Sequence, residues 1–154
     1  MSLTGGAVGV MRDSSAVASK AKEIIRVVIK GASGYGPVDL AFQDKVTITG
    51  DSIQYEYKPY IVSDTNQVRK WSYKTTNPAF RRKFDKLAKL IPGVMAADEE
   101  FVMDVGAITF TITYSDKTKE TREFFIPGGK FKKVFSVVRE MVPRGEEAPA
   151  VIGG

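Results

Sequence analysis

The chain has 154 residues, of which 43% are hydrophobic and 27% charged, so it can form one packed domain of ordinary size. Lysine and arginine (23) outnumber aspartate and glutamate (18), and the net charge of +5 slightly favours acidic partners. The sequence contains no cysteine and no histidine, which excludes disulfides, Ser-His-Asp and Cys-His catalysis, and nearly all zinc sites.

The N-terminal stretch, residues 1–22, is rich in glycine and small polar residues, and it predicts a flexible tail. It does not have the pattern of a secretory signal. No apolar run approaches the roughly 20 residues that a membrane helix needs. We therefore expect a cytoplasmic protein without a membrane partner.

The next segments alternate between apolar and polar residues, which is typical of strands. Residues 23–30 form the first, and a glycine-rich loop follows; residues 38–42 are ambiguous and fit a short edge strand. Residues 46–49 and 52–58 predict a hairpin, with Gly50 supplying the positive φ of a type II′ turn. Residues 68–75 predict another strand that carries Trp71 and Tyr73 on one face.

A helix is expected to begin at Asn77-Pro78, because asparagine caps helix N-termini and proline fits the first helical position. Apolar residues then recur at helical spacing, and Pro92-Gly93 is the expected end. The stripe consists of Phe80, Phe84, Leu87, Leu90 and Ile91.

The second half begins with an acidic connector at residues 98–100, which we interpret as a charged surface loop, and a brief strand at residues 101–105. Residues 107–114 and 118–126 predict a second hairpin. A second helix follows Gly128-Gly129 and closes at residues 143–145, before a C-terminal tail at residues 144–154. Its apolar stripe consists of Phe131, Val134, Phe135, Val138, Met141 and Val142.

The two helices also resemble each other, because the pattern of residues 80–92 returns at residues 131–143. The chain therefore predicts an α+β fold: a two-layer sandwich whose antiparallel sheet carries two amphipathic helices on one face. The expected domain spans residues 23–143, and its pseudo-repeat halves cover about 42–92 and 101–143.

Two groups of residues are candidate binding sites. Gly128, Gly129 and Lys130 at a helix start can hold an anion through free N–H groups and the helix dipole. The alternative for this group is a tight turn that lets the helix pack closely on its strand.

The second candidate is a nucleic-acid surface that combines basic helix faces with strand aromatics. The alternative is that the cations are solvated and the aromatics belong to the core. The residues are Arg81, Arg82, Lys86, Lys133, Trp71 and Tyr73.

The absence of a catalytic motif favours a non-enzymatic binding or protein-interaction module, with no cofactor and no metal. Its partner is an unidentified protein or a second copy, because a two-layer sandwich has open strand edges. The alternatives are a nucleic-acid-binding protein and a small-ligand carrier or enzyme with a pocket between sheet and helices.

Overall fold

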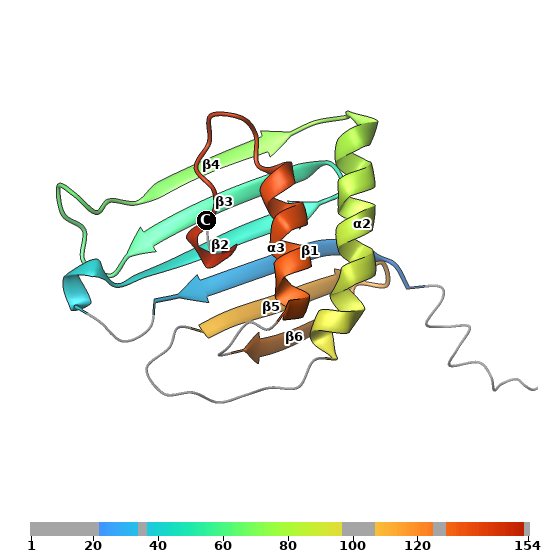
Figure 1. The fold of residues 1–154 in the computed structure, drawn as a ribbon, viewed down its shortest axis with the longest axis horizontal. Coiled ribbons are helices and arrows are strands. Elements are labelled where there is room, and N and C mark those ends of the chain that lie inside the picture. Colours follow the sequence, from blue (N-terminus) through green and yellow to red (C-terminus); the bar gives the residue numbers. More distant parts are fainter. Residues whose placement is uncertain (1–21, 34–36, 97–106, 125–128, 153–154) are drawn as a thin grey trace, which may run out of the picture.

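The computed structural model describes residues 22–33, 37–96, 107–124 and 129–152, which form a six-stranded antiparallel sheet and two α-helices (Figure 1). The α+β class is confirmed. The strands are β1 (Ile24–Ala32), β2 (Phe42–Thr49), β3 (Ser52–Pro59), β4 (Arg69–Lys74), β5 (Ala107–Tyr114) and β6 (Lys119–Phe124). The helices are α2 (Pro78–Met95) and α3 (Gly129–Met141), with short 3-10 helices η1 (Val38–Leu40) and η2 (Ala150–Ile152).

The strand order is β4-β3-β2-β1-β5-β6, so the two halves of the chain meet at β1. Val27 of β1 lies opposite Ile48 of β2 on one side and Ile112 of β5 on the other. Both pairs are antiparallel and buried on the same face. The centre of the sheet therefore depends on contacts between segments far apart in sequence.

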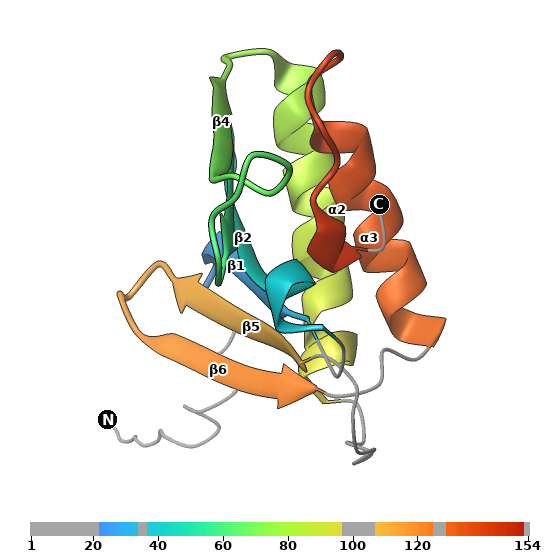
Figure 2. The same cartoon turned by 90° about the vertical axis from the view of Figure 1, so that its left-hand side faces the viewer.

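Both helices lie on one face of the sheet and pack against each other (Figure 2). The hydrophobic core fills the space between them and the sheet. Phe80, Phe84 and Phe131 are buried there, and Phe135 is half-buried. The transfer free energy of each fully buried phenylalanine is about 1.5–3 kcal/mol, so helix–sheet docking contributes most to the stability of the helices.

Helix α2 begins as expected, because the Asn77 side chain accepts a hydrogen bond from the Ala79 N–H at 2.9 Å. The expected end at Pro92-Gly93 is wrong, since the helix continues to Met95 with Pro92 inside it. A proline in a helix interior costs about 3 kcal/mol. The extra turn buries Val94 and Met95, which offsets that cost at about 1.5–3 kcal/mol each.

Two local expectations in the first half of the chain are also corrected. Residues 38–42 do not form an edge strand: residues 38–40 form η1, and Phe42 begins β2. The β2–β3 turn is not type II′, because the described glycine with positive φ is Gly145, not Gly50. Instead, the Thr49 hydroxyl closes the turn through Asp51 (2.9 Å) and Ser52 (2.6 Å). The strand expected at residues 101–105 lies outside the described residues.

The end of the chain is not a free tail as far as residue 152. After α3 the backbone runs along β4 and returns across the helix-covered face of the sheet (Figure 1). We call residues 147–152 the C-terminal strap. Its last residues, Val151 and Ile152, are buried, and η2 contacts β1, β2 and α3. The strap thus covers a part of the sheet that the two helices leave open.

Candidate functional site

The face of the sheet opposite the helices carries no covering helix among the described residues (Figure 2). Alternation along each strand turns one set of side chains toward the core and the other toward this face. We call it the open face. Antiparallel registers align its side chains into rows that cross the strands.

Three rows cross all six strands, as the strand registers and the Thr49–Ser52 hydrogen bond show, and a shorter fourth row contains Lys58, Gln43, Ala32 and Ala107. The first row contains Lys74, Ser52, Thr49, Arg26, Thr113 and Lys119. The middle row contains Ser72, Gln54, Thr47, Val28, Thr111 and Thr121. The third row contains Lys70, Glu56, Lys45, Lys30, Thr109 and Glu123.

The rows differ in charge. The first row carries cations and hydroxyls, with the Asp51 carboxylate bonded to the hydroxyl of Thr49, and the middle row carries no charge. The third row contains two glutamates, of which Glu56 lies 3.9 Å from the ammonium of Lys58. Because cations outnumber carboxylates across the rows, the face has a positive potential that attracts polyanions.

The open face is also hollowed. A depression of about 350 Å³ lies over the middle of the sheet, and its lining includes Lys30, Lys45, Lys58 and Thr109. A second depression, lined by Lys45, Thr47, Gln54 and Lys70 among others, lies beside it toward β4. Glu56 lines both depressions and Glu123 lines the first, so ammonium, hydroxyl and carboxylate groups share these shallow concave surfaces.

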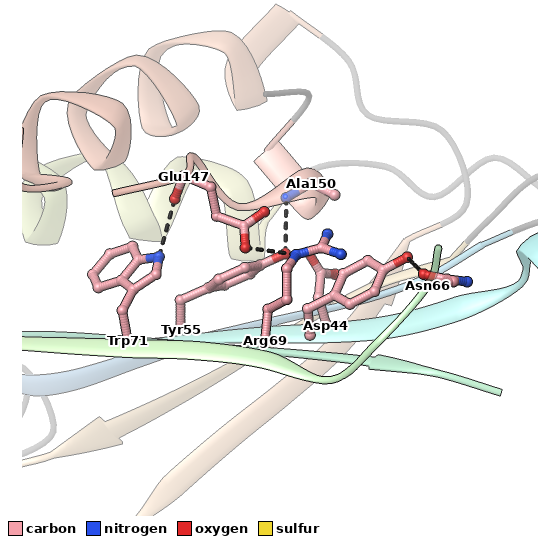
Figure 3. A network of polar contacts seen from close by, with 8 residues as sticks. Asp44, Tyr55, Asn66, Arg69, Trp71, Glu147 and Ala150 are labelled. Atoms are coloured by element: carbon pink, nitrogen blue, oxygen red, sulfur yellow. Dashed lines mark hydrogen bonds and ion pairs between the residues drawn. The ribbon is translucent and has the colours of Figure 1, made fainter. Parts of the chain in front are cut away.

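On the opposite side of the sheet, a polar network anchors the C-terminal strap (Figure 3). The Asp44 carboxylate is 4% exposed and accepts hydrogen bonds from the Tyr55 hydroxyl at 2.8 Å and the Val151 N–H at 2.9 Å. The Tyr55 hydroxyl accepts one from the Ala150 N–H at 3.3 Å. Through these bonds, the side chains of β2 and β3 satisfy backbone groups of the strap.

Further contacts continue this network toward β4. The Arg69 guanidinium lies 2.8 Å from the Glu147 carboxylate and stacks over the Tyr57 ring. The Trp71 indole N–H donates to the Glu147 carbonyl oxygen at 3.1 Å. The strap is therefore held at both ends, by β4 near Glu147 and by β2 near Val151.

Burial changes the titration of this network. It raises the pKa of Asp44 above its usual range, although the hydrogen bonds from Tyr55 and the strap partly oppose the shift. Burial likewise raises the pKa of the Tyr55 hydroxyl. The second carboxylate oxygen of Asp44 is buried without a hydrogen-bond partner. The hydrogen bonds from Tyr55 and Val151 to its other oxygen tie the Asp44 carboxylate to the strap.

The predicted nucleic-acid residues do not form one surface. Arg81, Arg82 and Lys86 are exposed on α2, and Lys133 is exposed on α3. The two aromatics lie on the helix-covered face of β4, where Trp71 sits under the strap and Tyr73 lies edge-on to Phe80. A platform that combines these cations with Trp71 is therefore absent, and nucleic-acid binding by the helices stays a prediction.

The predicted anion site lies partly outside the described residues. Gly128 lies outside the described residues, Gly129 begins α3, and nothing is described of the Lys130 side chain. Sequence reasoning, in contrast, did not identify the face of the sheet opposite the helices as a binding site. The signal for it was the polar half of each strand pattern, such as Lys45 and Thr47 in β2. The registers that align these residues with Lys30 and Thr111 were not readable from the sequence.

No group of three or more acidic side chains in the described part of the chain is placed to hold a metal ion. No helix within the described ranges is long and apolar enough to cross a membrane. A scan against protein-family models gives no match, and a search of curated proteins gives no relative. The geometry of the open face is thus the basis for a functional conclusion.

Proposed function

We propose that this chain is a non-enzymatic binding module for nucleic acid and that the sugar–phosphate backbone lies on the open face of the sheet. The observation that carries the proposal is the composition of this face. Lysine, arginine, threonine, serine and glutamine project from neighbouring strands, and among the three rows only Glu56 and Glu123 are acidic. Such groups contact phosphates and sugars without reading bases.

The spacing of the rows supports this ligand. Residues two apart on a strand are about 7 Å apart, so the first and third rows are separated by about 13 Å. Arg26 in the first row and Lys30 in the third lie on the same strand, β1. Cations thus recur across the face at intervals that suit a chain of phosphates, and three of them, Lys30, Lys45 and Lys58, line one depression within it.

The proposal is tested with paired charge removals on opposite sides of the molecule. Lys30→Gln with Lys45→Gln removes two cations from the open face, and Lys86→Gln with Lys89→Gln removes two exposed cations from α2. Binding is measured by fluorescence anisotropy with mixed-sequence single strands and duplexes over a range of salt concentrations.

We expect the wild-type affinity to fall steeply with salt, with a slope of about 0.7–0.9 for each neutralised phosphate. The open-face variant should lose about one unit of slope for each lysine that contacts a phosphate, whereas the helix variant should match the wild type. No binding at low salt overturns the proposal. A larger loss in the helix variant transfers the site to α2.

We also propose the finer architecture that the sequence suggested, a two-layer sandwich with an internal pseudo-repeat. Two observations support it. Each repeat is a hairpin followed by a helix on the same face, β3–β4–α2 and β5–β6–α3 (Figure 1). Equivalent positions are buried in both, as in Phe80 with Phe131 and Leu87 with Val138. The repeat would place one hairpin on each side of β1–β2, which gives the open face its width.

A further inference from the structure

The three rows of the open face that cross all six strands contain no aromatic side chain, and Tyr60, whose hydroxyl accepts a hydrogen bond from Gln43 of the short fourth row, follows β3 at the end of that row. The aromatic residues of the strands lie on the opposite, helix-covered face, where they pair in the core, as do Tyr55 with Trp71 and Phe110 with Phe124. Recognition of single strands depends on unpaired bases that stack on aromatic rings. The open face therefore suits a duplex, whose bases are already stacked on one another.

The breadth of the face narrows the choice of duplex. Six strands at about 4.8 Å spacing make each row roughly 24 Å long, and the outer rows lie about 13 Å apart, so the ligand must accept a broad surface rather than a single helix or ribbon. The major groove of B-DNA is about 12 Å wide and admits a helix or a two-stranded ribbon, and its minor groove is narrower still. The minor groove of A-form RNA is wide and shallow, so a broad surface can lie against it.

The middle row supplies the chemistry for such a groove. Its side chains are hydroxyls and amides apart from Val28, and the hydroxyls of Thr111 and Thr121 lie 3.3 Å apart. Each hydroxyl both donates and accepts a hydrogen bond. The 2′-hydroxyl, which DNA lacks, has the same capacity and lines the minor groove of duplex RNA. The cations of the first and third rows lie on either side of this neutral row.

We propose that the nucleic acid bound by the open face is double-stranded RNA, with its minor groove against the sheet. This inference rests on the proposed function. The first and third rows contact the phosphates of the two RNA strands. The middle row, in particular Thr47 and Thr111, hydrogen-bonds to 2′-hydroxyls between them. Recognition is by shape and sugar rather than by base sequence.

The test compares the full chain on a duplex RNA, a duplex DNA of the same sequence and the single-stranded RNA, all at one salt concentration. We expect the duplex RNA to bind about ten-fold more tightly than the other two, the effect of one or two net hydrogen bonds. Thr47→Val with Thr111→Val keeps side-chain volume and strand propensity but removes both hydroxyls. This variant should bind duplex RNA and duplex DNA equally, with an unchanged salt slope.

A matched control is Thr65→Val, which removes a hydroxyl from an exposed loop and should keep the RNA preference. Denaturant unfolding of each variant checks that the fold is intact. Equal wild-type affinity for duplex RNA and duplex DNA, with the loss on Lys30→Gln and Lys45→Gln retained, overturns this inference and leaves the proposed function standing. Tighter binding of the single strand overturns it too. No binding to any of the three overturns both.

Discussion

Replacing Ile152 by alanine tests how firmly the C-terminal strap is held on the sheet. The Ile152 side chain is 1% exposed, and its carbonyl oxygen accepts a hydrogen bond from Arg139 at 3.0 Å. It follows Val151, whose N–H bonds to Asp44. Because the strap follows the last helix, it can leave the sheet without breaking any strand pairing.

The strap contacts give an estimate of its docking free energy. Burial of Val151 and Ile152 contributes about 3–6 kcal/mol. The strap's bonds to Trp71, Tyr55, Asp44 and Arg139 add about 2–6 kcal/mol. Ordering the backbone of residues 147–152 costs about 6–12 kcal/mol. Docking is therefore nearly balanced, and a buried isoleucine-to-alanine change, which costs about 2–5 kcal/mol, should release the strap.

Trp71 is the chain's single tryptophan, and it reports directly on the strap because its indole N–H bonds to Glu147. We expect Ile152→Ala to shift tryptophan emission to the red under native conditions. Trypsin should cleave the variant at Arg144 faster than the wild type, while circular dichroism of the sheet is retained. Val62→Ala, at a side chain 63% exposed in a loop, is the control and should change neither measurement.

A different result for Ile152→Ala would refute the idea that the strap is released on its own. If tryptophan emission is unchanged and the variant loses about 2–5 kcal/mol in a single cooperative unfolding transition, the strap belongs to the cooperative core. The near-balance derived above would then be wrong.

Two further predictions concern the groups beneath the strap. Because burial raises the pKa of Asp44, the folded state binds its proton more tightly than the unfolded chain, so the free energy of unfolding should fall as pH rises through the raised pKa. Asp44→Asn should remove this fall in denaturant titrations at a series of pH values; an unchanged pH profile would mean that Asp44 is not its source. Gly31→Ala should displace the strap and shift Trp71 emission, since a Cβ at Gly31 would lie 2.6 Å from Val151 and 2.7 Å from Asp44. Gly93→Ala in α2, where a Cβ would meet no atom within 4 Å, should instead raise the free energy of unfolding by about 0.5–1 kcal/mol. If both substitutions destabilise the protein, the contacts of Val151 and Asp44 with Gly31 do not explain the effect at Gly31.

The elements of the fold were predictable where a single periodicity decides the structure. The alternation in β5 and the helical stripe of α2 are both local signals; β5 forms at the expected residues, and α2 begins where it was expected. Prediction failed where a distant contact outweighs a local preference. Pro92 stays inside α2 because the next turn is buried, and Gly50 takes no positive φ because side-chain hydrogen bonds close its turn.

The site was less predictable, because it depends on pairing between distant segments. Asp44 shares a face with Val46 and Ile48, which was a readable sign of burial. Its partner is the N–H of Val151, in a stretch that composition indicated to be a tail. The rows of the open face have the same difficulty, since Lys30 and Lys45 become neighbours only through the register of β1 and β2.

The register of β2 determines which side chains point to each face of the sheet. A slip of one residue in β2 would turn Lys45 toward the core and Asp44 toward the open face, because successive side chains point to opposite sides. It would also separate Asp44 from the Tyr55 hydroxyl and from the strap. The misaligned sheet is therefore less stable, because it loses the hydrogen bonds of the buried Asp44 carboxylate. The same network that holds the strap thus keeps Lys45 and Thr47 directed toward solvent, where the proposed ligand binds.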